Sequence, residues 1–405
     1  MVRPEYPPQV AEIMARLERA GHAAYLVGGA LRDAMLGRGA HDFDVTTSAL
    51  PHQMTEVFSD YPVIETGLKH GTLTVLADGL PIEITTFRID GEYRDARHPE
   101  AVTFTDRIED DLARRDFTVN AMAYNPSRGL VDVFGGEGDL ASGVIRAVRD
   151  PHDRFREDAL RILRAFRFMS KLDFQIEPHT LSAARDCREE LTKISAERIT
   201  AELCGLFEGR AAEAALVAMA QSGIWQTLAP ELSISPSNAK GIDALPRRFE
   251  VRFAYFVRQT SDGGESLIRR LRLSNASRGH IHVLLSLRGV SLLPPSSARV
   301  RRLLAAAGAY VDDAEALLSA DGFFDLTRAD ADQILAMVRQ ARQGSPCLSL
   351  SALAIDGRAL MAVGFQGREI GTVLAALLER VLDDPDLNRP EALLSMAEKM
   401  KNQKN

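Results

Sequence analysis

Apolar and polar positions change their spacing several times within the first ~150 residues, which predicts a domain that mixes helices with strands. Stretches with apolar side chains three and four apart alternate with stretches in which every second side chain is apolar. A glycine or an Asp-Gly pair ends most of these stretches, as turns require. The expected elements are a helix over 9–20, a strand over 23–27, a helix over 30–37, a strand over 42–47 and a hairpin of two strands over 71–87.

Strand patterns nearly disappear after Asp153, and helical spacing dominates the rest of the chain. Stretches rich in Ser and Pro interrupt this spacing at 232–237 and 294–297, and a third break lies at 343–349. The fold class that follows is an α+β head followed by an all-α remainder. Helices are expected over 157–169, 178–190, 195–208 and most of 211–345.

Composition narrows the class of protein further. The chain has 405 residues, 45% of them hydrophobic, which is enough to bury the cores of roughly two to four domains. Its three cysteines are widely spaced, so we expect neither a disulfide framework nor a zinc site, and we expect a cytoplasmic protein. No stretch approaches ~18 uninterrupted apolar residues, and the N-terminus lacks a signal peptide's apolar segment, so no membrane association is expected.

The net charge of −7 argues weakly against binding of nucleic acid. Phosphate binding, however, needs only a local basic patch, and arginines cluster in the second half of the chain. The clusters lie at 247–248, 269–272 and 299–302. They are either solvated helix faces or contacts for a phosphate backbone, and the sequence leaves both interpretations open.

Two aspartates on one expected strand are the first candidates for chemistry. Asp42 and Asp44 lie two positions apart, so both side chains point to the same face of the strand. Glu83, on a neighbouring strand, could add a third carboxylate. A divalent cation such as Mg²⁺ would offset the repulsion, and two metal ions could activate an attacking hydroxyl and stabilise a leaving pyrophosphate. The alternatives are solvated aspartates at a strand end and a surface glutamate.

A glycine turn precedes these aspartates in the chain. Gly28 and Gly29 end the expected strand over 23–27, and a helix begins after them. Amides at a helix N-terminus attract phosphate, and glycine lets the phosphate come close. Arg32 could hold a triphosphate from the same turn. A glycine turn alone is weak evidence, but the two aspartates that follow it make the interpretation stronger.

The segment RRDFTVNAMAY, residues 114–124, places charged and polar side chains inside an otherwise apolar stretch. Arg115, Asp116 and Asn120 therefore predict a buried polar network or a ligand pocket. A second glycine turn follows within residues 131–140. We interpret that turn as a hinge rather than as a phosphate loop.

The expected helix over 157–169 carries one polar face. Asp158, Arg161, Arg164 and Arg167 are spaced by three and lie opposite the apolar residues that would pack into the core. One carboxylate and three guanidiniums could hydrogen-bond the edge of a nucleobase and hold phosphates. The alternative is an ordinary amphipathic helix in which Asp158 and Arg161 form an ion pair with each other.

Five segments, taken in order, resemble the motifs of the class II tRNA nucleotidyltransferases, a set shared with bacterial poly(A) polymerases. These segments are LVGGALRD, HDFDVTT, RRDFTVNAMAY, VDVFGG and REDALRILRAFRF, all between residues 24 and 170. The segment SAERITAEL and the stretch over 353–388 are similar to the neck and tail of bacterial CCA-adding enzymes. The resemblance implies a head like that of polymerase β at 1–148, a neck at 149–210, a helical body at 211–345 and a tail at 346–405.

The resemblance also implies roles for the candidate residues. Asp42 and Asp44 would hold the metal ions, with Glu83 as the third carboxylate. The nucleotide-binding residues would be Gly28, Gly29, Arg32, Arg115, Asp116, Asn120, Asp158, Arg161, Arg164 and Arg167. Within this set, Asp158 and Arg161 would pair with the base of CTP or ATP. A mobile loop at 91–104 would be needed for the switch from C addition to A addition.

The function expected from this resemblance is template-independent addition of CCA to the 3′ end of tRNA from CTP and ATP. The reaction would use Mg²⁺ and release pyrophosphate, and no obligate protein partner is implied. A poly(A) polymerase and an enzyme that adds only the last A are the enzymatic alternatives. A catalytically idle RNA-binding module is the non-enzymatic one. A phosphohydrolase is disfavoured, because the sequence has no repeated His-Asp pattern.

Overall fold

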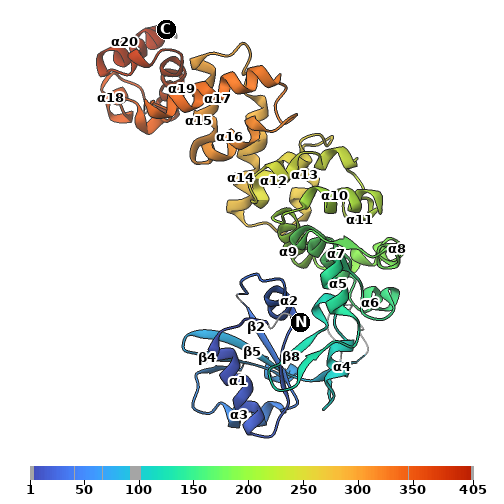
Figure 1. The fold of residues 1–405 in the computed structure, drawn as a ribbon. Coiled ribbons are helices and arrows are strands. Elements are labelled where there is room, and N and C mark those ends of the chain that lie inside the picture. Colours follow the sequence, from blue (N-terminus) through green and yellow to red (C-terminus); the bar gives the residue numbers. More distant parts are fainter. Residues whose placement is uncertain (1–3, 41, 66, 92–101, 345, 403–405) are drawn as a thin grey trace. The chain divides into compact units, whose positions relative to one another are not determined.

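The computed structural model describes residues 4–40, 42–65, 67–91, 102–344 and 346–402. The chain forms two compact units, Met1–Pro236 and Ser237–Asn405 (Figure 1). Strands occur only in the first unit, as far as the described residues extend. Among these residues, no helix is both long and apolar enough to span a lipid bilayer.

A seven-stranded mixed sheet forms the centre of the first unit, in the order β3-β4-β5-β2-β1-β8-β9. Its strands are β1 (Ala24–Val27), β2 (Phe43–Thr47), β3 (Val63–Ile64), β4 (Thr72–Ala77), β5 (Leu80–Thr86), β8 (Ala123–Asn125) and β9 (Gly129–Val131). β2 and β5 run parallel, and the other neighbours run antiparallel. β4 and β5 form the expected hairpin, since Asp78 and Gly79 both take the positive φ values that a tight two-residue turn requires.

Short elements complete the head around this sheet. Helix α1 (Pro8–Arg19) buries Val10, Ile13, Met14 and Leu17 and packs on β1 and β2, as its apolar spacing predicts. Helix α2 begins directly where β1 ends. The remaining elements are α2 (Gly28–Met35), α3 (Pro51–Val57), η1 (Leu68–His70), the ribbon of β6 (Arg88–Asp90) and β7 (Val102–Phe104), α4 (Ile108–Ala113), η2 (Thr118–Asn120), α5 (Gly136–Ser142) and β10 (Val144–Ile145).

Helices make up the rest of the first unit, apart from the two-residue strand β11. These elements are α6 (Pro151–Glu157), α7 (Leu160–Leu172), β11 (Gln175–Ile176), α8 (Pro178–Asp186), η3 (Arg188–Lys193), α9 (Ala196–Phe207), α10 (Ala212–Gln221) and α11 (Ile224–Leu228). Helix α7 packs against α9 and α10, and α6 packs against α8. The loss of strand patterns after Asp153 is therefore confirmed.

The prediction of a single helix over 157–169 is wrong at its first residues. Asp158 has extended backbone angles, φ −146° and ψ 102°, and separates α6 from α7. Its side-chain Oδ1 accepts a hydrogen bond from the amide of Leu160 at 3.1 Å. An aspartate that bonds to a nearby amide in this way competes with helix hydrogen bonds, which accounts for the break. The apolar side of the expected helix is confirmed, because Ala159, Ile162, Leu163 and Phe166 are all buried.

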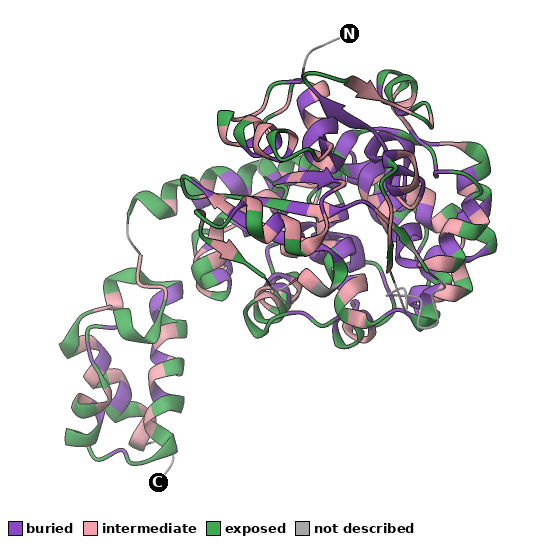
Figure 2. Cartoon of the chain, turned by 90° about the horizontal axis from the view of Figure 1, so that it is seen from below, coloured by how far each residue is buried: buried purple, intermediate pink, exposed green. Residues whose placement is uncertain are grey.

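The described part of the second unit is helical. Its elements are η4 (Pro236–Ala239), η5 (Ile242–Ala244), α12 (Phe249–Val257), α13 (Glu265–Arg270), α14 (Asn275–Ser286), η6 (Leu287–Gly289), α15 (Ser297–Ala307), η7 (Gly308–Tyr310), α16 (Val311–Ser319), α17 (Arg328–Gln343), η8 (Leu350–Ala352), α18 (Gly357–Ala362), α19 (Arg368–Asp383), η9 (Pro385–Leu387) and α20 (Pro390–Asn402). The last three helices share a small core that contains Leu360, Leu377 and Leu393, and their outward positions are exposed (Figure 2).

Candidate active site

Three carboxylates converge at one place on the central sheet. Asp44 lies in β2 directly opposite Glu83 in β5, because the two parallel strands pair in that register. Asp42 lies in a bend directly before β2, close enough for its negative charge to act on Asp44. Asp44 is half-buried, whereas Asp42 and Glu83 are exposed. The three carboxylates are therefore neighbours, although their oxygen atoms do not all lie within 4.8 Å of one another, and their joint binding of a metal ion stays a prediction.

The electrostatic balance at this cluster favours a bound cation. Burial raises the pKa of Asp44, the positive charge of Arg115 lowers it, and the negative charges of Glu83 and Asp42 raise it again, to about 6. A carboxylate whose charged form is disfavoured in this way gains from a divalent cation. The three side chains offer only oxygen atoms, the ligand type that Mg²⁺ and similar hard cations prefer. The cluster therefore fits a divalent metal ion.

The glycine turn lies against this cluster. Gly28 begins α2 with φ +68°, and a Cβ atom there would lie 3.1 Å from Asp44 Oδ2 and 3.3 Å from Arg115 Nη1. Glycine is therefore required both by its backbone angle and by the closeness of the carboxylate. The amides at the start of α2 lie beside the cluster as a result. Their binding of phosphate stays a prediction, as does that of Gly29.

Arg32 is buried, with 3% of its surface exposed. Its Nη1 donates to Asn120 Oδ1 at 2.7 Å, and its Nη2 pairs with Asp33 Oδ1 at 2.8 Å. Its guanidinium also lies 5.3 Å from the centre of the Phe168 ring. The structure thus ties Arg32 to protein groups, and a contact with triphosphate stays a prediction.

The polar network expected within 114–124 is confirmed. Asp116 is buried and accepts hydrogen bonds from Arg164 at 2.6 and 2.8 Å and from Asn120 Nδ2 at 3.2 Å. Burial alone would raise the pKa of Asp116, but Arg164, Asn120 and the charge of Arg161 outweigh it and lower the pKa to about 2. Asp116 is therefore ionised at neutral pH and holds Arg164 and Asn120 in place.

Arg115 belongs to a second ion pair beside this network. Its Nη2 lies 3.3 Å from Asp111 Oδ2, and Asp111 has no exposed surface. The same aspartate pairs with Arg114 at 2.8 Å. Arg115 thus lies between the buried Asp111 on α4 and the carboxylate of Asp44. Its positive charge partly offsets the negative charges of the three carboxylates.

Asp158 and Arg161 do not form the ion pair with each other that the helical spacing allows. Asp158 Oδ2 accepts from Arg198 at 2.7 Å, and Arg161 Nη1 donates to Glu157 Oε2 at 2.6 Å. Arg161 also donates to the main-chain carbonyl of Arg114 at 3.1 Å. The break at Asp158 explains this outcome, because the aspartate no longer lies one turn below Arg161 on a continuous helix.

Arg164 and Arg167 meet around one glutamate and one aromatic ring. Glu202 on α9 pairs with Arg167 at 2.5 Å and with Arg164 at 3.9 Å. The guanidiniums of Arg164 and Arg167 lie 5.5 and 4.5 Å from the centre of the Phe168 ring. These contacts hold the polar face of α7 against α9, and a contact of either arginine with nucleotide stays a prediction.

Sequence reasoning missed several members of this network. They are Asp111, Glu157, Phe168, Arg198 and Glu202. One signal was available, since Arg198 and Glu202 lie four residues apart and thus on one side of a strongly amphipathic segment. Asp111 and Phe168 gave no such signal, because an aspartate in an acidic run and a phenylalanine in a core pattern are ordinary.

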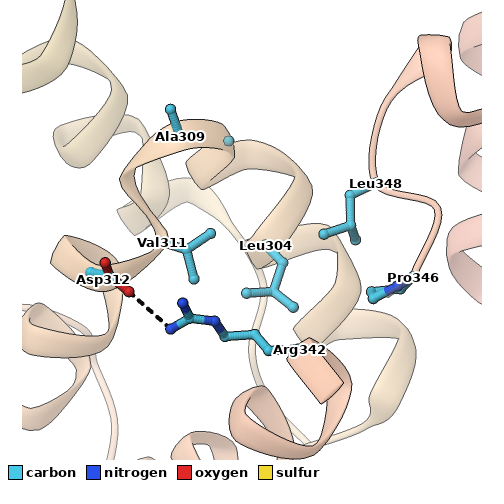
Figure 3. Close-up of a pocket in the computed structure, with 8 residues that line it drawn as sticks. Leu304, Ala309, Val311, Asp312, Arg342, Pro346 and Leu348 are labelled. Carbon is cyan, nitrogen blue, oxygen red and sulfur yellow. Dashed lines mark ion pairs between the residues drawn. The ribbon is translucent and has the colours of Figure 1, made fainter. Parts of the chain in front are cut away.

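A pocket of about 380 Å³ lies elsewhere, inside the second unit. Its lining includes Leu304, Val311 and Leu348, and an ion pair between Arg342 and Asp312 at 2.9 Å crosses it (Figure 3). None of the residues with expected catalytic or nucleotide-binding roles lines it. The pocket therefore does not belong to the candidate active site.

The expected mobile loop at 91–104 falls largely outside the described residues, which omit 92–101. The described flanks are Gly91 and the strand β7, which pairs with β6. The role of this loop therefore stays a prediction.

Comparisons with known proteins place the chain in one family. Residues 24–146 match the poly A polymerase head domain, and residues 173–234 match the probable RNA and SrmB-binding site of polymerase A. A CCA-adding enzyme of Bacillus licheniformis is 35% identical over 373 residues, which cover 91% of each chain. A CCA-adding enzyme of Lactobacillus helveticus is 50% identical over 190 residues, about half the length of each chain at 47%.

Solved structures agree with these sequence relationships. The CCA-adding enzyme of Bacillus stearothermophilus, solved in complex with CTP, matches with a TM-score of 0.81 and 29% identity over 99% of both chains. The CCA-adding enzyme of Thermotoga maritima, solved in complex with tRNA, has the same fold, with a TM-score of 0.69 and 24% identity over 98% of this chain and 95% of that one. The expected fold, a nucleotidyltransferase head followed by helices, is confirmed. The chain belongs to the family of the CCA-adding enzymes and is a tRNA nucleotidyltransferase.

Proposed function

We propose that this chain adds C, C and A in turn to the 3′ end of tRNA, using CTP and ATP and releasing pyrophosphate. The observation that carries the proposal is the cluster of Asp42, Asp44 and Glu83 beside the glycine turn at Gly28. It unites carboxylates that suit a divalent cation with amides that suit a triphosphate. The relative with 91% coverage bears the same activity in its name.

A divalent metal ion is used throughout this family, and we propose that Mg²⁺ is the ion and that Asp42 and Asp44 hold it. Bound there, it would polarise the α-phosphate and stabilise the leaving pyrophosphate. Glu83 adds negative charge from the neighbouring strand and strengthens the attraction for the cation. Arg115 partly offsets that charge and keeps Asp44 ionised near neutral pH.

The base would be recognised by Asp158 and Arg161. A carboxylate only accepts and a guanidinium only donates, so together they complement the amino group and ring nitrogen of cytosine and adenine. Uracil and guanine present the opposite pattern. Asp158 pairs with Arg198, and Arg161 pairs with Glu157. We therefore propose that the base competes with these partners when it binds.

The supporting positions would hold this pocket in shape. Asp116 fixes Arg164 and Asn120, Asn120 fixes Arg32, and Glu202 fixes Arg167. We propose that the head at 1–148 performs catalysis, that the neck at 149–210 reads the base, and that the body at 211–345 and tail at 346–405 bind tRNA. The cytoplasm, where tRNA substrates and reducing conditions occur together, is the proposed site of action.

The deciding experiment supplies purified protein with tRNA that ends before CCA, together with labelled CTP, labelled ATP or both. CCA addition predicts two C residues from CTP alone, no product from ATP alone, and a complete end from the mixture. An enzyme that adds only the last A would leave this substrate unlabelled but would label tRNA that already ends in CC, which is supplied as a second substrate. A poly(A) polymerase would extend the substrate with ATP alone, and an idle RNA-binding module would give no product.

A further inference from the structure

Two neighbouring helices of the first unit begin with an acidic residue, a proline and a histidine. Asp150 and His152 lie at the start of α6, and Glu177 and His179 lie at the start of α8. Because α6 and α8 pack against each other, the two imidazoles meet, with ring centroids 5.8 Å apart and planes inclined by 57°. Neither helix start has a role in the proposed chemistry.

Three of these side chains can reach one ion. Potential ligand atoms of Asp150, His152 and His179 all lie within 4.8 Å of one another. No other trio of His, Cys, Asp or Glu in the described part of the chain meets this condition. Metal–ligand bonds of ~2.0–2.2 Å to nitrogen and oxygen could span such a triangle after small side-chain rotations.

Asp150 is prepared to act as an anionic ligand. Its Oδ1 accepts the amides of His152 at 2.9 Å and Asp153 at 3.2 Å, which leaves Oδ2 for another partner.

A fourth side chain orients one of the histidines. Asp186, at the end of α8, places Oδ2 3.1 Å from Nε2 of His152. If Nε2 carries the proton and donates to Asp186, the lone pair of Nδ1 is on the side of Asp150, whose Oδ1 lies 3.8 Å away. A histidine that donates one ring N–H to a carboxylate while the other nitrogen binds metal is a recurrent arrangement at metal sites. This geometry is an observation independent of the three-residue grouping.

We propose that Asp150, His152 and His179 form a binding site for one divalent transition-metal cation of the zinc class, with Asp186 orienting His152. Two imidazole nitrogens and one carboxylate suit Zn²⁺ and its neighbours, whereas Mg²⁺ selects oxygen ligands. The site is thus chemically distinct from the carboxylates on β2 and β5. A cation held there joins the starts of α6 and α8 and stabilises the helix that leads directly into Asp158.

The test titrates the full-length, tag-free protein with Zn²⁺ by isothermal calorimetry in a large excess of Mg²⁺, which occupies the oxygen-only carboxylate cluster. One Zn²⁺ should bind per chain. His152→Ala and His179→Ala should each weaken binding by at least ~10-fold, and Asp186→Asn should weaken it by about 10-fold. The matched control is His52→Ala, because His52 is exposed on α3 and does not belong to the grouping.

A second readout separates loss of the site from loss of folding. Co²⁺ should give visible absorption bands in the wild type and in His52→Ala but not in His152→Ala, and Zn²⁺ should raise the Tm of the first two only. Circular dichroism confirms that each variant folds. Zn²⁺ affinity that is equal in wild type, His152→Ala and His179→Ala would overturn the proposal, as would the absence of any binding to folded wild-type protein.

Discussion

At the scale of single residues, Asp44 is where function and stability oppose each other most clearly. Its charged form is disfavoured by burial and by Glu83 and Asp42, so its pKa is raised to about 6. Asp44→Asn removes that charge and the proposed metal ligand together. We expect nucleotide addition to fall below about a tenth of the wild-type rate, while the Tm measured without metal stays unchanged or rises. Initial rates with labelled CTP and thermal unfolding measure the two effects.

The matched control for this variant is Glu56→Gln. Glu56 is also an acidic residue of the head, but it is exposed on α3. It should keep both activity and Tm. A folded Asp44→Asn protein that retains most of its activity would show that the metal ligands lie elsewhere.

The raised pKa of Asp44 also predicts a pH dependence of metal binding. A metal ion needs the ionised carboxylate, so protons compete with it once the pH falls below the pKa of about 6. Affinity for Mg²⁺ should be constant from pH 7 to 8 and should weaken by up to ~10-fold per pH unit below pH 6. Calorimetric titrations at pH 5, 6, 7 and 8 measure this, and Asp44→Asn, which lacks the proposed ligand, should bind Mg²⁺ far more weakly at each of these pH values. A flat profile in the wild type would contradict the raised pKa.

At the scale of elements, the break between α6 and α7 places Asp158 outside the helix that holds Arg161. If the two nevertheless read the base, Asp158→Ala should lose discrimination as well as rate. A site that hydrogen-bonds its substrate can reject a mismatched analogue by about 10⁴. We therefore expect the ratio of kcat/KM for CTP over UTP to fall by at least ~100-fold in Asp158→Ala. The measurement is kcat/KM for all four nucleotides.

Arg198→Ala distinguishes base reading from a purely structural ion pair. It removes the partner of Asp158 but leaves the carboxylate itself. Discrimination between CTP and UTP should therefore be kept. If Asp158→Ala and Arg198→Ala alter stability alike and leave the choice of nucleotide unchanged, the only role of Asp158 is its ion pair with Arg198, which links α9 to the segment between α6 and α7.

The contact between α7 and the segment before β8 depends on the ion pair of Asp116 with Arg164. Asp116→Asn leaves Arg164, whose side chain is 33% exposed, with only the longer ion pair to Glu202 at 3.9 Å, and should cost about 2 kcal/mol of unfolding free energy. The pKa of Asp116 is lowered from 3.8 to about 2, so this stabilisation is complete above about pH 4 and disappears as the pH falls toward 2. Urea unfolding at pH 7 and at decreasing pH measures both effects.

Glu12→Gln is the control for this ion pair. Glu12 pairs with Arg19 at 2.6 Å, but the two side chains are 49% and 65% exposed. Its replacement should cost less than about 1 kcal/mol. Equal losses of unfolding free energy in Asp116→Asn and Glu12→Gln would show that burial does not strengthen the Asp116–Arg164 ion pair.

The elements also show what the sequence could predict and what it could not. Alternation along β2 and β5 predicted both strands and the outward faces of Asp44 and Glu83 before their register was known, although β2 begins only after Asp42. The break at Asp158 was not predictable from spacing, because helical periodicity continues across it. Partners such as Arg198 and Glu202 were also not predictable, because the pairs Asp158–Arg198 and Arg167–Glu202 join residues 40 and 35 positions apart. Local patterns determine strands and helix faces, whereas packing of α7 on α9 determines which charges meet.

At the scale of the whole molecule, charge is divided unevenly between the two units. Residues 237–405 carry 23 lysines and arginines against 19 aspartates and glutamates, a net charge of +4. Since the whole chain carries −7, residues 1–236 carry −11. An acidic protein can thus still present a basic unit to a tRNA backbone, because phosphate binding responds to local charge.

The arginine clusters of the second unit differ in their ion pairs and in their exposure to solvent. Arg302 pairs with Glu379 at 2.9 Å and with Asp383 at 2.8 Å, and Arg248 pairs with the buried Asp313. Arg269 and Arg272, at and just beyond the end of α13, are exposed. Because the side chains of Arg269 and Arg272 are exposed, the cluster at 269–272 can reach a phosphate backbone.

This difference gives a prediction about how tRNA affinity depends on salt. Each arginine that contacts a phosphate displaces about one counterion, so the logarithm of the affinity falls linearly with the logarithm of the salt concentration. Removing two such contacts in Arg269→Ala/Arg272→Ala should weaken binding of tRNA and reduce the slope by up to about two. Arg302→Ala should leave the slope almost unchanged, because acidic neighbours already neutralise Arg302. Fluorescence anisotropy with labelled tRNA between 50 and 300 mM KCl, roughly the range over which such contacts weaken strongly, measures both slopes. If the double variant keeps the wild-type slope, the end of α13 does not touch the backbone; if no protein shows a slope, the helical unit does not bind tRNA through its phosphates.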